Sequence, residues 1–116
     1  MYARVWRANI LPGKVEEHTA AVRAVVPILR RRAGFRSLVL LRGGSGDRLE
    51  SMVVSVWESL VTLRDSETAE FERAVAHVLS FCERHPSMRE EEVLLDEFVS
   101  SHPGGAIDPD DTITKF

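Results

Sequence analysis

The spacing of apolar residues along the first third of the chain predicts a strand followed by a helix. Residues 2–11 are aromatic or β-branched with polar residues interleaved, which favours a strand, and Pro12-Gly13 is a turn pair that ends it. The helix is indicated by a stripe at steps of three and four that ends before Gly34. Because Pro27 lies inside it, we expect a kink or break between about residues 23 and 27. The stripe comprises Val15, His18, Val22, Val25 and Leu29.

The next part of the chain predicts two more strands, a two-part helical region and a last strand. Residues 35–42 and 49–57 read as antiparallel strands joined by a glycine-rich turn. Apolar residues then recur at helical spacing, which predicts a short helix near residues 59–64 and a longer one from about residue 67 to residue 84. Residues 91–100 predict the fourth strand.

The order strand, helix, strand, strand, helix, strand is that of a ferredoxin-like α+β fold. Right-handed crossovers would place both helices on one face of a four-stranded antiparallel sheet. The strands carry apolar side chains on both faces, since Leu38 and Leu40 alternate with Val39 and Leu41. One helical layer covers only one face, so we expect a homodimer in which the other sheet face meets a second copy.

Length and composition predict one domain over residues 1–100 and an extended or mobile tail over residues 101–116. Fifteen basic and eighteen acidic residues give a formal charge of -3, so we expect neither nucleic acid nor a membrane as partner. Cys82 is the only cysteine, which excludes an intramolecular disulfide and fits a reducing compartment. Arg4 and Arg7 interrupt the apolar start of the chain and argue against a signal peptide, so a cytoplasmic location is expected.

Three short motifs, in this order and spacing, carry a resemblance to a known family. They are Pro12-Gly13-Lys14 after the first strand, Gly34-Phe35 at the second, and Trp57-Glu58-Ser59 after the third. With them, residues 1–99 resemble the antibiotic biosynthesis monooxygenase domain superfamily of small dimeric α+β barrels. The resemblance implies a ferredoxin-like dimer and leaves the reaction open, because one fold carries many activities.

The resemblance implies three classes of function. Cofactor-independent quinol or anthrone monooxygenases let the substrate's own electron-rich ring reduce oxygen. Those enzymes often place an Asn four residues before the motif tryptophan and a Tyr six after it, where this chain has Val53 and Leu63. Heme-degrading members resemble the chain through Asn9 and His77, yet also carry a second-helix tryptophan that the region around Ser66 lacks. The third class comprises other small-metabolite enzymes and catalytically silent, ligand-binding dimers.

The leading interpretation is a cofactor-independent monooxygenase acting on a small aromatic or quinol-like metabolite, with no metal. His77 lies at the rim of its helical stripe and is the predicted base, because an imidazole titrates near neutrality. Asn9 and Arg7 share one strand face and are oxyanion partners if that face meets the helices, or structural groups if it meets a second copy.

Two further residues are interpreted in two ways. Trp57 forms either a stacking wall for an aromatic substrate or part of the core, and Glu58 and Ser59 are expected to cap the following helix. His18, on the first stripe, either faces the space between helices and sheet as a substrate-binding group or is a satisfied, partly buried histidine.

Overall fold

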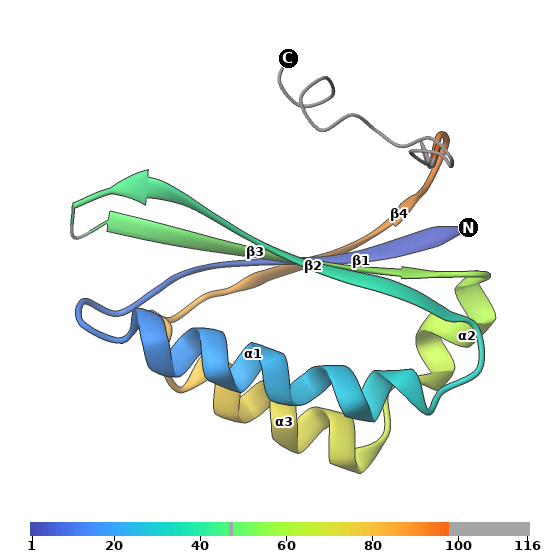
Figure 1. Ribbon diagram of the computed structural model, residues 1–116, viewed down its shortest axis with the longest axis horizontal. Helices are drawn as coiled ribbons and strands as arrows, with labels where there is room; N and C mark the ends of the chain where they lie inside the picture. Colours follow the sequence, from blue (N-terminus) through green and yellow to red (C-terminus); the bar gives the residue numbers. More distant parts are fainter. Residues whose placement is uncertain (47, 98–116) are drawn as a thin grey trace, which may run out of the picture.

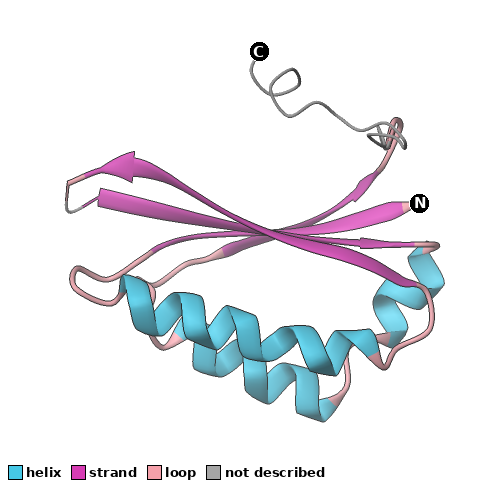
Figure 2. Cartoon of the chain, viewed as in Figure 1, coloured by secondary structure: helices cyan, strands magenta, loops and turns pink. Residues whose placement is uncertain are grey.

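The predicted order of elements is confirmed by a computed structural model, which describes residues 1–46 and 48–97 (Figures 1 and 2). The tail predicted over residues 101–116 lies outside the described residues. The elements are β1 (Tyr2–Asn9), α1 (Val15–Arg30), β2 (Phe35–Ser45), β3 (Arg48–Trp57), α2 (Leu60–Asp65), α3 (Ala69–Leu79) and β4 (Ser87–Glu92). The strands form one antiparallel sheet in the order β2-β3-β1-β4, which is a ferredoxin-like α+β arrangement.

Helices α1 and α3 lie on the same face of the sheet, and the short α2 stands near one end of it (Figure 1). Residues directly opposite each other in an antiparallel pair share a face. Arg4 pairs with Ser55 and Trp6 with Val53, and all four line the space under the helices. The alternate residues, among them Val5, therefore form the outer face of the sheet.

Helix α1 runs without interruption from Val15 to Arg30, so it has no break between residues 23 and 27, and that alternative of the prediction is wrong. Pro27 is exposed. On the solvent side of a helix, carbonyls tilt towards water and their hydrogen bonds are long, so the bond that a proline removes there is the one most easily lost.

Helix α3 ends at Leu79, five residues earlier than predicted, because the chain that follows pairs with the end of β1. The Ile10–Cys82 bridge, the bond from Leu11 N to Phe81 O (2.9 Å) and the bond from Glu83 N to Asn9 O (2.8 Å) hold this connection.

Strand β4 occupies Ser87–Glu92, so it begins earlier than the predicted strand over residues 91–100 and does not include residues 93–97. Residues 98–100 of that prediction lie outside the described residues. Its sequence, SMREEE, has no apolar alternation because β4 is an edge strand, and charged side chains suit an exposed edge. The apolar run that suggested a later strand contains Leu94 and Leu95, which are both strongly exposed.

The core lies between the sheet and the helices and is centred on Trp57, Leu63 and Leu29. The second helical region begins as the sequence indicates, because Ser59 caps α2: its Oγ accepts a hydrogen bond from Thr62 N at 3.1 Å, and Ser59 N donates to Thr62 Oγ1 at 3.2 Å.

Candidate active site

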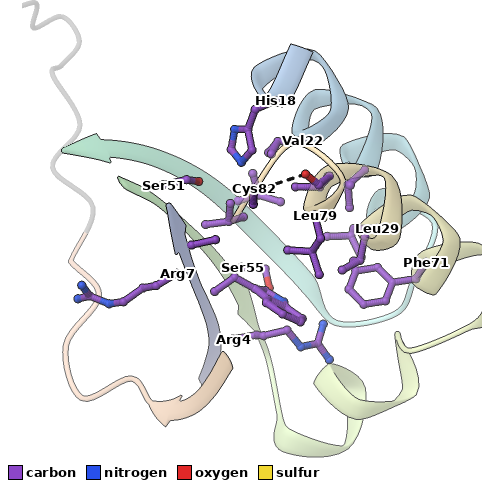
Figure 3. A pocket seen from close by; sticks show the side chains of 17 residues that line it. Arg4, Arg7, His18, Val22, Leu29, Ser51, Ser55, Phe71, Leu79 and Cys82 are labelled. Carbon is purple, nitrogen blue, oxygen red and sulfur yellow. Dashed lines mark hydrogen bonds between the residues drawn. The ribbon is translucent and has the colours of Figure 1, made fainter. Parts of the chain in front are cut away.

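A narrow cavity of about 50 Å³ lies between the sheet and helices α1 and α3 (Figure 3). Its walls are mainly aliphatic and aromatic, with a few polar side chains from β1, β3 and α1. The apolar members include Val22, Val25, Leu29, Phe71, Val75 and Val78, and the polar members include Arg4, His18, Ser51 and Ser55. An apolar space with a few polar groups is typical of a small-molecule site.

His18 contributes the imidazole of this cavity. It lies on the buried stripe of α1, and only 2% of its surface is exposed. Burial lowers the pKa of His18, and the positive charge of Arg42 lowers it further. The ring is therefore neutral near pH 7 and can accept a proton, so the structure favours the cavity-facing interpretation of this residue.

His18 also stands between the cavity and the surface. A depression of about 360 Å³ shares His18 and Ser51 with the cavity and is otherwise lined by Ile10, Thr19, Leu40, Leu41 and Arg42. The imidazole therefore borders both the cavity and this depression.

Arg4 is a cavity residue that the sequence interpretation missed. Its guanidinium is almost fully buried, and its Nη2 donates to Leu63 O at 2.8 Å and to Glu67 Oε2 at 2.8 Å, while Nη1 donates to Ser66 Oγ at 3.2 Å. The guanidinium carbon lies 5.1 Å from the centre of the Phe71 ring. Burial lowers the pKa of Arg4 and Glu67 opposes that shift, so the group stays a fixed cation at the end of the cavity.

The structure places Trp57 in the core and not in the cavity wall. The side chain is fully buried, its Nε1 donates to Ser55 Oγ at 3.0 Å, and Phe35 packs edge-on with ring centres 5.3 Å apart. Trp57 is absent from the cavity lining, which leaves the core interpretation as the one that the geometry supports.

Arg7 and Asn9 belong to the outer face, opposite the helices. Arg7 borders the cavity, but its side chain extends away from it (Figure 3). The side chain is half exposed, and its Nη1 lies 3.8 Å from Glu50 Oε1. Asn9 is exposed and is not a lining residue. The alternative left open by the sequence is thus resolved: the face that meets the helices is that of Trp6, Ala8 and Ile10.

His77 lies outside the cavity as well. It is exposed on α3, and its ring packs edge-on against Phe81 at 5.1 Å between ring centres. The structure therefore brings His18 and Arg4 to one cavity, and it does not bring Asn9 and His77 there.

The sequence profile described as antibiotic biosynthesis monooxygenase matches residues 1–76, which is well over half of the chain. The chain belongs to the antibiotic biosynthesis monooxygenase family. A comparison with curated proteins finds no match.

Solved structures of low sequence identity share the fold. The chain is similar to SnoaB, a cofactor-independent oxygenase from Streptomyces nogalater, at 14% identity and a TM-score of 0.64, over 84% of this chain and 95% of that one. It is similar to Rv0793 from Mycobacterium tuberculosis at 21% identity and a TM-score of 0.66, over 83% and 96% of the two chains. A conserved protein from Methanosarcina mazei Go1 is 12% identical with a TM-score of 0.64, over 78% and 90%.

As a member of the antibiotic biosynthesis monooxygenase family, the chain has two apolar residues where the resemblance implies polar ones. Val53 lines the cavity, so the wall there is aliphatic. Leu63 is fully buried in the core, and its contribution to the site is the carbonyl that accepts from Arg4. Polar groups enter this cavity from β1 and α1, and from Ser51 and Ser55 on either side of Val53 in β3.

One sequence signal could have identified Arg4. The alternation along β1 puts it on the same face as Trp6, Ala8 and Ile10, where a cation is unexpected unless it is paired. Over residues 1–46 and 48–97, no group of three or more His, Cys, Asp or Glu side chains is placed to hold a metal ion. No helix in these same ranges has the length and apolar character needed to cross a membrane.

Proposed function

We propose that this protein is a cofactor-independent monooxygenase acting on a small aromatic or quinol-like substrate, with His18 as the general base. The observation that carries the proposal is a neutral, buried imidazole beside a mainly apolar cavity. Membership of the family and the likeness to SnoaB, described as a cofactor-independent oxygenase, support the reaction class.

The reaction requires only the substrate and oxygen. His18 takes the proton of a phenolic hydroxyl, and the electron-rich phenolate supplies electrons to O₂ at a ring carbon that bears hydrogen. The resulting hydroperoxide loses water to give a carbonyl, so one oxygen atom enters the product and the other leaves as water with the two substrate hydrogens. Apolar walls favour this chemistry because they exclude water from the peroxide.

The volume of the cavity restricts the substrate. Sites for drug-sized ligands have volumes of about 300–1,000 Å³, whereas this cavity has about 50 Å³. We therefore propose a single-ring phenol or quinol in preference to a fused polycyclic substrate. Side chains of α1 and α3 have to move apart to admit even one ring.

Oxygen uptake with a panel of phenols, quinols and naphthols tests the proposal, with His18→Gln compared with His77→Gln. Loss of the base is expected to lower kcat by about 100-fold or more, whereas replacing the exposed His77 should change it less than about twofold. Turnover that survives in H18Q, or that disappears in H77Q instead, would contradict the assignment of the base. Absence of oxygen uptake with every compound would contradict the reaction class.

We also propose that two copies associate through the outer face of the sheet. Val5, Val54 and Val39 stand side by side across β1, β3 and β2, and Leu41 lies opposite Met52 beside them. Val39 and Leu41 are 46% and 48% exposed, and no described residue covers them. An apolar sheet face of this kind is stabilised when a second sheet packs on it.

A further inference from the structure

The depression beside His18 is polar and carries a positive charge. It has a volume of about 360 Å³, and its polar lining consists of the side chains of His18, Thr19, Arg42 and Ser51. Among the described residues, no aspartate or glutamate lines it. A guanidinium and hydroxyl groups donate hydrogen bonds, and those from a charged donor to a carboxylate are the strongest of them. The composition of the depression therefore favours an anionic group.

Arg42 supplies the positive charge, and the strand register places it on the helix side of the sheet. It lies opposite Ser51 in the β2–β3 pair, and Ser51 is buried and lines the cavity. Opposite residues of an antiparallel pair share a face. Arg42 therefore belongs to the face towards which His18 points from α1 (Figure 3). It is also exposed, so a ligand reaches it directly from solution.

The charge of Arg42 has no partner in the described part of the chain. No described carboxylate lies within ion-pair distance of its guanidinium. Glu50 is the neighbour of Ser51 on β3, but successive residues of a strand point to opposite faces. Glu50 lies on the outer face instead, where its Oε1 is 3.8 Å from Arg7 Nη1. The guanidinium of Arg42 is thus available to an anion from outside the chain.

The depression adjoins the cavity of the proposed active site. His18 and Ser51 line both spaces. The cavity side of this border is mainly apolar, and the other side holds Arg42. A ligand that spans the border therefore needs an apolar ring at one end and an anionic group at the other.

We propose that the substrate is a phenolic acid, whose carboxylate binds Arg42 in the depression while its ring enters the cavity. The phenol rests on the proposed function, and the acid extends that function by naming the group that selects the substrate. Arg42 is then a specificity-determining residue, because a neutral phenol cannot form charge-assisted hydrogen bonds with its guanidinium.

A bound carboxylate would also make His18 a better base. Burial is the larger cause of the lowered pKa of His18, and the charge of Arg42 is the second. A carboxylate on Arg42 offsets the second cause, so the pKa of His18 should rise in the complex. A general base is most effective when its pKa approaches the working pH, so the acid group of the substrate assists removal of the phenolic proton.

Matched pairs of ligands test the charge alone. 4-Hydroxyphenylacetate and 4-hydroxyphenylacetamide have nearly the same shape, but only the acid is charged at pH 7, and calorimetry without oxygen measures their binding without turnover. The acid should bind about threefold to fivefold more tightly in about 20 mM salt, and less so in about 0.5 M salt, because exposed ion pairs are weak and screened. The hydroxybenzoate and hydroxyphenylpropanoate pairs cover other spacings between ring and acid. Equal affinities in all three pairs would overturn the proposal.

Substitutions on β2 test the assignment of Arg42. Arg42→Gln should abolish the preference for the acid, and Arg42→Lys, which keeps the charge, should retain most of it. Arg36→Gln makes the same charge change six residues away on β2, a distance of about 20 Å. That is well beyond the screening length of about 8 Å at physiological salt, so this control should keep the preference. A preference that survives in R42Q, or that R36Q removes equally, would overturn the assignment.

The titration of His18, followed by NMR, is a second readout of the same contact. Its pKa should rise when the wild type is saturated with 4-hydroxyphenylacetate and should not rise with the amide, because only the acid offsets the charge of Arg42. Acetate is the control for a carboxylate without a ring, and we expect it not to saturate the protein at the same concentrations. Acetate that bound as tightly as the phenolic acid would show a site for any small anion, and the proposed substrate class would be wrong.

Failure of this proposal is distinguishable from failure of the proposed oxygenase reaction. The binding experiments involve no turnover, so a protein that consumes no oxygen can still prefer the acid to its amide. Such a result would support the acid site and contradict the reaction class. Oxygen uptake that depends on His18, with no preference for the acid in binding, would support the reaction and overturn the acid site.

Discussion

Arg4 of β1 and Glu67 of the α2–α3 connection, 63 residues apart in the sequence, form a 2.8 Å ion pair at the end of the cavity. The arginine is 1% exposed and the glutamate 41% exposed, so the pair joins a buried cation to a partner at the surface. It ties the central strand β1 to the segment that positions α3. The stability of the cavity therefore depends on a charge that a single substitution can remove.

Glu67→Gln is expected to lower the free energy of unfolding by about 1–2 kcal/mol. The variant keeps an oxygen acceptor but leaves the buried guanidinium without its counter-charge, and partial exposure of Glu67 limits the loss. Glu70→Gln is the matched control, because its 2.8 Å pair with Arg31 is exposed on both sides and should contribute below about 0.5 kcal/mol. Urea denaturation of the three proteins measures both effects, and equal losses would contradict the role of burial.

Stability is expected to fall as the solution is acidified through the titration of His18. Burial and Arg42 lower the pKa of the folded imidazole, so below the ordinary value near 6.5 the unfolded chain binds a proton that the folded protein resists. The stability that depends on a neutral His18 is therefore fully present above the pKa that this residue has in the unfolded chain. It is lost as pH falls through the lower pKa of the folded protein, by at most about 1.4 kcal/mol per pH unit.

His18→Gln should flatten this dependence, which thermal unfolding between pH 5 and pH 8 would detect. His77→Gln is the comparison, since that histidine is exposed. An acid slope that is the same in wild type and H18Q would show that other groups cause it.

Gly34→Ala is expected to destabilise the protein by about 2–4 kcal/mol. Gly34 has φ +83°, a conformation unfavourable for alanine, and an added Cβ would stand 2.5 Å from the side chain of Thr62, which completes the cap of α2. Gly13→Ala is the control: its φ is +77° but no atom lies near its Cβ position, so it isolates the backbone strain of about 1–2 kcal/mol. If both variants lost the same stability, the contact with Thr62 would be unimportant.

The sequence predicts those elements of the fold in which apolar residues recur at regular spacing. The stripe on α1 identified both the helix and the buried side of His18, and alternation along β1 separated Trp6 from Arg7 correctly. Strand β4 was misplaced because an edge strand made of charged residues has no apolar alternation to detect.

The site was harder to predict because it depends on contacts that no local spacing encodes. Arg4 is held at the cavity by hydrogen bonds to Leu63 and Glu67, which are distant from it in the sequence. Trp57 and His77 were predicted as site residues from their side-chain chemistry, but packing decides where each side chain lies. Trp57 is enclosed by the core, and His77 is exposed on α3. Residue chemistry alone therefore identified His18 as a cavity residue but not Arg4.

Val54→Lys is expected to convert a dimer into a monomer at micromolar concentration. Val54 pairs with Val5 on one side and Val39 on the other, so it lies at the centre of the outer sheet face. A two-fold interface would bury the lysine twice, and we expect at least a 100-fold weaker association. Val61→Lys makes the same change on α2, away from the sheet face, where valine is 67% exposed, and should leave the dimer intact. Light scattering after gel filtration measures the mass of each protein. A monomeric wild type, or a V54K variant that remains dimeric, would mean that the outer face is not the interface.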